Sequence, residues 1–490
     1  MYMRRSGILL PISSLWSKYG IGAFSKEAYQ FIDFLKDSGQ KLWQILPLGP
    51  TGYGDSPYQS FSTFAGNPYF IDLEELVSQG LLTEEECIKS EGKPGKVNYA
   101  HIYKERLPLL KLAYQRSDIK NLEEYKTFAE ENSFWLEDYA LYMAIKTYFK
   151  GESWIGWEEQ IKLHQKIEVE KYREQLVEEI ESYKFQQYYF HKQWKSLKEY
   201  ANRNGIKIIG DLPIYVSLDS ADAWANPELF LLDEENIPKA VSGCPPDAFS
   251  PTGQLWGNPL YNWKYHKETD YSWWTQRMKK SFELYDIVRI DHFRGFDEYY
   301  SIPYGSTDAI TGRWEKGPGM DIFYHLKKAL GEQEIIAEDL GFLTDSVIQL
   351  VEDSGYPGMK VLQFAFDSRE ESDYYPHNYK ANSVVYTGTH DNDTTFHWFE
   401  ELEEKDKILA RKYLNLKEDS QICDHMIHTA FSSVADTCII PMQDYLELGS
   451  EGRINRPSTL GDNWTWRLLG GECTKELSER ILELTTIYQR

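Results

Sequence analysis

The sequence predicts a parallel α/β fold, because about eight short apolar runs of β character alternate with segments of helical periodicity. Three of these runs end in a carboxylate, and the residues concerned are Asp291, Glu338 and Asp391. A buried carboxylate is unfavourable unless it has a partner, a ligand or a chemical role. Since the strands of a parallel barrel all end at one face, we expect the three side chains to meet there.

Residues 1–73 have the pattern strand, helix, strand. The two strands are expected at 7–12 and 42–48, where apolar residues run together. Between them, Ser25 is placed to cap a helix that Gly39 ends. This segment therefore supplies the first two strands of the barrel.

Residues 74–195 differ from the segments on either side, because charged sequence with helical periodicity dominates. One helix is expected to begin at Ser133, and another is expected over about 167–183. No convincing buried strand is visible in this range. We therefore expect a mainly helical insertion after the second strand.

The strand and helix alternation resumes at residues 196–216, where 206–215 is expected to form the third strand. Residues 217–263 are rich in Pro, Gly and Trp, and Gly257–Pro259 is expected to be a turn. A loop of that length inside a domain is usually functional, so we expect a loop-rich insertion over the active site. The rest of the barrel, with smaller insertions, is expected over 264–490, with strands near 286–292, 334–339, 359–364, 383–388 and 436–441.

Composition excludes several classes of function. The 490 residues suit one enlarged barrel or two to three domains. The net charge of −24 argues against nucleic acid or an anionic membrane as the main partner. No apolar stretch is long enough to span a membrane, and Pro11 interrupts the N-terminal apolar run, so we expect a cytoplasmic protein. The five cysteines form no C-x-x-C pair, which suits a reducing compartment and offers no zinc site.

The carboxylates suggest glycosidic-bond chemistry. Arg289 and Asp291 are two apart on a strand, so their side chains leave the same face, and the guanidinium favours an ionised nucleophile. Glu338 follows an apolar run, which favours the protonated form that a general acid requires. The structural alternatives are an Arg–Asp pair within the barrel and a glutamate that caps the following turn.

The segment after the strand at 383–388 contains Asp391 and Asp393, a spacing that occurs in calcium loops. The third oxygen ligand, the glycine and the distal glutamate of such a loop are missing, so we expect no metal. Hydrogen bonding to sugar hydroxyls is the better use of these carboxylates. The aromatic and amide-rich loops around 53–60 and 245–259 are each expected to be tight turns, and together they predict a sugar-binding surface.

Five segments carry a resemblance to a known family: 46–59, the loop of Asp247 and Trp256, 289–295, 337–341 and 388–393. Together, and in the right order, they resemble the 4-α-glucanotransferases (amylomaltases, disproportionating enzymes; glycoside hydrolase family 77). The resemblance covers nearly the whole chain. It implies a (β/α)8 TIM barrel with inserted subdomains and a retaining double displacement on α-1,4-glucans and maltooligosaccharides, with no cofactor and no metal.

The resemblance also implies roles for individual residues. Asp291 would attack the anomeric carbon, Glu338 would be the acid/base, and Asp391 would hold and distort the sugar at subsite −1. The substrate-binding set is completed by Tyr58, Asp211, Gln254, Trp256, Arg289, His390 and Asn463, with Trp256 over the acceptor side. Tyr53 matches an aromatic residue of a second glucan site.

The sequence departs from the family pattern at Ser458, which stands where the family usually has glycine before the run Asn463–Arg467. If that glycine serves a positive φ, serine is strained there. Two other functions stay open: an α-glucan hydrolase of the α-amylase type, and a non-catalytic glucan-binding protein on a decayed barrel. We expect a monomer or a weak homo-oligomer.

Overall fold

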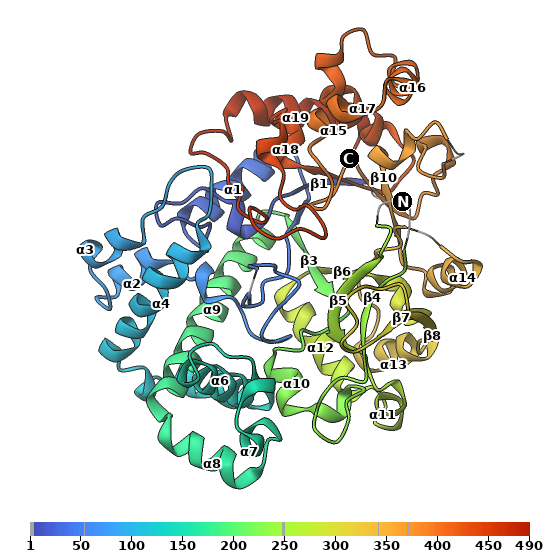
Figure 1. The fold of residues 1–490 in the computed structure, drawn as a ribbon. Helices are drawn as coiled ribbons and strands as arrows, with labels where there is room; N and C mark the ends of the chain where they lie inside the picture. The colour runs from blue at the N-terminus through green and yellow to red at the C-terminus, as the bar shows by residue number, and fades with distance from the viewer. Residues whose placement is uncertain (1–3, 53, 247–249, 342, 370–371) are drawn as a thin grey trace.

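The computed structural model describes residues 4–52, 54–246, 250–341, 343–369 and 372–490. Eight parallel strands form a closed barrel in the order β1-β12-β11-β10-β9-β6-β3-β2 (Figure 1). The strands are β1 (Arg5–Leu9), β2 (Leu42–Gln44), β3 (Lys207–Pro213), β6 (Ile287–Asp291), β9 (Ile335–Ala337), β10 (Gly358–Val361), β11 (Ser383–Tyr386) and β12 (Thr437–Pro441). Each overlaps a run that the sequence predicted, so the α/β barrel is confirmed.

The helices that follow the barrel strands form its outer layer. They include α1 (Lys26–Asp37), α12 (Ser272–Leu284), α13 (Met320–Leu330), α14 (Asp345–Ser354), α15 (Thr395–Glu401), α16 (Glu404–Leu414), α17 (Ile422–Ser432), α18 (Met442–Tyr445) and α19 (Lys475–Tyr488). Ser25 is the N-cap residue of α1, as predicted, and Gly39 follows the helix with a φ of 71°. Glycine is needed there because other residues rarely adopt that conformation.

The range 74–195 holds a group of helices that lies to one side of the barrel (Figure 1). They are α2 (Leu73–Ser78), α3 (Glu84–Cys87), α4 (Tyr99–Arg116), α5 (Glu123–Glu131), α6 (Ser133–Tyr148), α7 (Glu159–Lys162), α8 (Lys166–Gln175) and α9 (Val177–Arg203). The prediction of a single helix over 167–183 is wrong, because the helical conformation is interrupted at Leu176, between α8 and α9. Helix α9 then continues to Arg203 and connects the insertion to β3.

A second sheet lies at the lower right of the view in Figure 1, whereas these helices lie at its left. Its strands are antiparallel, in the order β5 (Gln254–Pro259), β4 (Ala240–Cys244), β7 (Glu298–Pro303) and β8 (Arg313–Lys316). The turn expected at Gly257–Pro259 is wrong, because these residues lie within β5, where Pro259 pairs with Val241 of β4 after an irregularity in the register. The same region contains the short helices α10 (Ala221–Ala225) and α11 (Trp263–Glu268).

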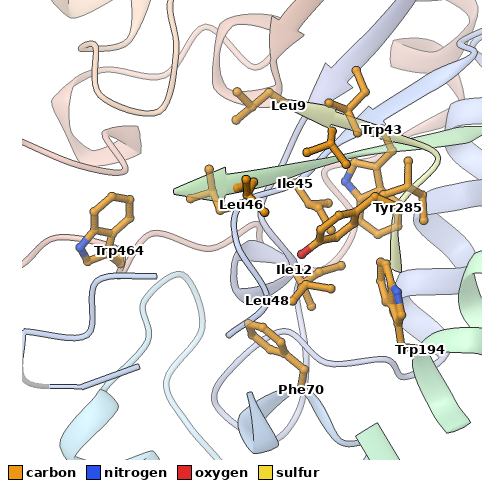
Figure 2. Packing of buried hydrophobic residues seen from close by; sticks show 14 of the residues in the cluster. Leu9, Ile12, Trp43, Ile45, Leu46, Leu48, Phe70, Trp194, Tyr285 and Trp464 are labelled. Atoms are coloured by element: carbon orange, nitrogen blue, oxygen red, sulfur yellow. The ribbon is translucent and has the colours of Figure 1, made fainter. Parts of the chain in front are cut away.

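The hydrophobic core fills the barrel and the layer between its strands and helices. Figure 2 shows Trp43, Ile45 and Tyr285 packed together beside β2. The Trp43 indole donates a hydrogen bond to the carbonyl oxygen of Leu10 at 2.8 Å, so its polar atom is satisfied. Gly210 on β3 lies against the Tyr285 ring, and a Cβ there would come within 2.1 Å of it. No helix in the described ranges is both long enough and apolar enough to cross a membrane.

Candidate active site

Asp291 and Glu338 lie at the same end of two neighbouring barrel strands. Strands β6 and β9 are paired in parallel, with Ile290 opposite Ala337. Asp291 is the last residue of β6, and Glu338 directly follows β9. The backbone N–H of Glu338 donates to the Ile290 carbonyl at 3.1 Å, so the strand pairing extends to this carboxylate. The strand ends therefore bring the two side chains to one level of the barrel, as the sequence predicted.

The Glu338 carboxylate is oriented by the backbone on both sides. The N–H of His292 donates to its Oε2 at 2.6 Å, and the N–H of Leu340 donates to its Oε1 at 3.0 Å. His292 has a φ of 53°, an uncommon conformation for a residue with a side chain. Local strain of this kind persists where the surrounding structure imposes it, as is common at functional sites.

Arg289 joins two aspartates in the interior of the barrel. Its Nη1 lies 2.6 Å from Asp211 Oδ2, and its Nη2 lies 3.1 Å from Asp291 Oδ1. Asp211 is opposite Arg289 in the register of β3 and β6, and both side chains are buried. The Arg289–Asp291 pair that was open as a structural alternative therefore exists, and Asp211 shares the same guanidinium.

Tyr58 and His390 complete this cluster. The Tyr58 hydroxyl donates to Asp211 Oδ2 at 2.7 Å and lies 2.8 Å from His390 Nε2. The two rings are stacked, with centroids 5.3 Å apart, and Trp464 packs against both. Burial lowers the pKa of His390, so the imidazole is neutral at pH 7. Because the Tyr58 hydroxyl donates its proton to Asp211, the His390 Nε2–H is the group that can donate to that hydroxyl.

Asp391 is the most accessible of the three carboxylates, with 47 % of its side chain exposed. Its Oδ1 accepts a hydrogen bond from Asn455 Nδ2 at 2.6 Å and lies 3.4 Å from His390 Nε2. Asp393 instead contacts Arg453 Nη1 at 2.7 Å. The two aspartates of the D-x-D sequence thus have different partners. In the part of the chain that the structure describes, no group of three or more His, Cys, Asp or Glu side chains is arranged to hold a metal ion.

The two candidate catalytic carboxyls influence each other. Burial raises the pKa of Glu338, while Arg289 and the two backbone donors oppose this effect without cancelling it. Burial also raises the pKa of Asp291 well above its usual range; Arg289 opposes it, and the charges of Asp211, Glu338 and Asp391 add to it. The sequence predicted the effect of Arg289 but not that burial would outweigh it. Because the groups interact, their proton losses belong to the pair and not to either residue.

Trp256 lies on β5 at the edge of this cluster and is half-buried. Its Nε1 donates to Gln254 Oε1 at 3.0 Å, so two of the predicted substrate-binding residues contact each other. The indole meets the His292 ring edge to face, with centroids 4.8 Å apart. The backbone N–H of His292 also donates to Glu338. His292 therefore lies between Trp256 and the candidate acid/base and contacts both.

Residues 10–472 match a protein-family model described as 4-alpha-glucanotransferase. The chain belongs to this family. The predicted family, fold class and enzyme class are thereby confirmed. The 4-alpha-glucanotransferase of Clostridium butyricum is 51 % identical, and the comparison covers 98 % of this chain and all of the relative. That of Streptococcus pneumoniae TIGR4 is 50 % identical over the whole of this chain and 98 % of the relative.

Solved structures agree with this assignment. The amylomaltase from Streptococcus agalactiae, determined in complex with acarbose, superposes with a TM-score of 0.96 at 41 % identity and covers 99 % of both chains. The amylomaltase from Corynebacterium glutamicum has the same fold at 18 % identity, with a TM-score of 0.78 over 98 % of this chain and 75 % of that one.

One predicted residue of the 4-alpha-glucanotransferase set, Asn463, lies apart from the carboxylate cluster. The Asn463 side chain accepts a hydrogen bond from the Arg456 N–H and donates to Thr459, so it is bonded within its own loop. Asn463 also lines a cleft of about 1400 Å³, together with Gly52, Gly54 and Tyr69. Tyr53, the predicted second-site aromatic, lies outside the described residues.

Asn455 is a candidate site residue that the sequence reasoning missed. It belongs to the segment 453–458, which stands out in the sequence only because Ser458 departs from the family pattern. Nothing in one sequence distinguishes Asn455 from Asn463 as the amide near Asp391, because the contact depends on how the loop folds back. Ser458 does have a positive φ, 61°, which agrees with the reason proposed for the usual glycine.

Proposed function

We propose that this 4-alpha-glucanotransferase moves α-1,4-glucan segments from a donor maltooligosaccharide to a second maltooligosaccharide or to glucose, through a covalent bond to Asp291. The observation that carries the proposal is the pairing of β6 with β9, which puts Asp291 and Glu338 side by side at the barrel mouth. Retaining enzymes hold their two carboxyl groups about 5–5.5 Å apart, whereas inverting enzymes leave room for a water molecule. Carboxyls at the ends of adjacent strands suit the shorter separation.

In the first step, Asp291 attacks the anomeric carbon while Glu338 gives its proton to the oxygen of the glycosidic bond. That bond breaks, the shortened glucan leaves with the proton, and a glycosyl ester of Asp291 forms. In the second step, Glu338 takes the proton from an acceptor hydroxyl, whose oxygen attacks the anomeric carbon and releases Asp291. Configuration is retained because the carbon is inverted twice.

The first step requires one ionised and one protonated carboxyl, and we propose that Asp291 is the ionised one. Asp291 contacts the guanidinium of Arg289, whereas Glu338 has no ion pair among the described residues. The proposed mechanism uses the state of the coupled pair in which Asp291 is ionised and Glu338 keeps the proton, and the contact of Asp291 with Arg289 supports this choice. The positive charge of Arg289 then stabilises the carboxylate that leaves in the second step.

The surrounding residues are proposed to bind sugar. Asp391, oriented by Asn455, accepts hydrogen bonds from the sugar at subsite −1, and such bonds strengthen at the transition state. Tyr58, Asp211 and His390 form the wall behind this sugar. Trp256 and Gln254 lie on the acceptor side. The cleft that Asn463 lines is proposed as the second glucan site, with Tyr53 as its aromatic residue. No cofactor takes part.

The alternative is an α-glucan hydrolase, in which water replaces the acceptor at the same intermediate. The decisive experiment is incubation of the pure protein with maltotriose and separation of the products. A series of longer glucans together with glucose identifies transfer, whereas glucose and maltose alone identify hydrolysis. The variant Asp291→Asn should lose nearly all turnover and still bind maltooligosaccharides in calorimetry; full activity would overturn the assignment of the nucleophile.

We also propose a cytoplasmic protein that is a monomer or a weak homo-oligomer and has no nucleic-acid partner. The buried cysteines Cys87, Cys423 and Cys438 form no disulfide bond, which suits a reducing compartment. The net charge of −24 disfavours binding to polyanions. Sedimentation of the purified protein over a range of concentrations tests the oligomeric state.

A further inference from the structure

Asp444 is a buried carboxylate that the proposed mechanism does not use. It lies on α18, which directly follows β12, and only 2 % of the residue is exposed. No ion pair to Asp444 is found in the described ranges of the chain, and burial raises the pKa of this carboxyl. A buried carboxylate without a cation is unfavourable unless hydrogen bonds satisfy it. The residues that donate hydrogen bonds to Asp444 therefore indicate which parts of the chain this carboxylate holds together.

The donors to Asp444 come from two residues eight positions apart. The Thr387 hydroxyl donates to Oδ2 at 2.5 Å, and the Thr395 hydroxyl donates to the same oxygen at 2.7 Å. The backbone N–H of Thr395 donates to Oδ1 at 2.8 Å. Thr387 is the first residue after β11, and Thr395 is the first residue of α15. Asp444 therefore joins the two ends of the loop 387–395.

This loop carries His390 and Asp391, two residues of the candidate site. Its other side is held by Gln363, whose Nε2 donates to the Asp393 carbonyl at 2.9 Å. Among the described residues, the Asp391 carboxylate itself contacts only Asn455 and His390, and it is the most exposed of the three. Its position thus depends on how firmly the loop is closed at its base.

We propose that Asp444 is a positioning residue, which acts through Thr387 and Thr395 to hold Asp391 where it contacts the sugar. This inference rests on the proposed role of Asp391. A misplacement of about 1 Å can lower a rate by roughly a hundredfold, so loosening the loop should affect the chemical step. Because hydrogen bonds that Asp391 accepts from the sugar strengthen at the transition state, the effect should fall on kcat more than on KM.

The test uses the matched pair Thr387→Val and Thr387→Ser. Valine has nearly the same shape as threonine but lacks the hydroxyl, whereas serine keeps it. We expect Thr387→Val to lower kcat for maltotriose about tenfold with KM nearly unchanged, while Thr387→Ser stays within about twofold of the wild type. Melting temperature and circular dichroism are recorded for each variant, and rates are measured well below the melting temperature.

A lower melting temperature with unchanged kcat in Thr387→Val would show that Asp444 only stabilises the fold, and it would overturn the inference. If Thr387→Val does not fold, the pair Thr395→Val and Thr395→Ser decides the question by the same criteria. The wild type is assayed alongside: absence of longer glucans there would refute the proposed function. A normal product series from the wild type with unaffected threonine-to-valine variants would refute only the role of Asp444.

Discussion

Removal of one hydroxyl, in Tyr58→Phe, tests the network behind the candidate nucleophile. The Tyr58 hydroxyl is one of two donors to Asp211 Oδ2; the other is Arg289 at 2.6 Å. Asp211 is fully buried, and its Oδ1 has no hydrogen-bond partner among the described residues. The variant therefore leaves this carboxylate with one protein donor, and it also removes the contact to His390.

The size of the effect follows from these contacts. A hydrogen bond to an ionised group contributes about 1.5–3 kcal/mol. If the bond is needed to hold Asp211 and Arg289 in place behind Asp291 at the transition state, its loss corresponds to a fall of roughly 10- to 150-fold in kcat/KM. Initial rates of glucose release from maltotriose, measured with an enzyme-coupled assay, give the value.

Tyr386→Phe is the matched control. The Tyr386 hydroxyl is buried inside the barrel and donates to Gln44 Oε1 at 2.9 Å, a neutral partner. We expect this control to lower the melting temperature and to leave kcat/KM within about twofold of the wild type. Equal rates for Tyr58→Phe and the wild type would refute the reasoning, as would equal losses in the two variants.

Three further outcomes are expected. Trp256→Ala should lower the rate of transfer more than the rate at which the intermediate forms, and should raise the share of hydrolysis, because the indole is expected to stack on the acceptor and exclude water. The measurement compares free glucose with chain-extended products at matched conversion. An unchanged ratio would indicate that Trp256 has a packing role only. Burial lowers the pKa of His266 to about 4, so neutral His266 contributes stability above pH 6.5. Up to about 3 kcal/mol of the free energy of unfolding is lost as the pH falls from 6.5 towards 4, because over this range His266 is protonated in the unfolded chain but still neutral in the folded one. His266→Phe should therefore show a shallower decline of melting temperature below pH 6.5, and identical slopes would contradict this. Prolonged chelation should leave activity unchanged; loss of activity restored by one divalent ion would reveal a metal site.

The sequence predicted the barrel strands better than it predicted the second sheet. A buried parallel strand needs a short run of apolar residues, and the runs around Val288, Ile336 and Val384 carry that signal without help from their neighbours. Strands β4, β5, β7 and β8 lack it. Gly257 and Pro259 lie within β5, and both are typical of turns, but the pairing of β5 with β4 overrides that local preference.

The candidate site shows the same division. Strand ends can be located from the chain alone, and this is why the sequence predicts that Asp291, Glu338 and Arg289 lie together. The residues that orient them come from loops. Asn455 lies 64 positions from Asp391, and Asp444 lies 57 positions from Thr387. Contacts between such distant positions leave no periodic signal in one sequence.

The sequence by itself determined the fold class, the family and the order of the three carboxylates, because each depends on local pattern and on motifs of a few adjacent residues. Only the tertiary structure decided that Asn455 and not Asn463 holds Asp391, that Trp256 lies on a strand, and that burial outweighs Arg289 in raising the pKa of Asp291. The physical reason is that loop closure, strand pairing and desolvation are properties of the packed chain, in which residues far apart in sequence exclude water from one another.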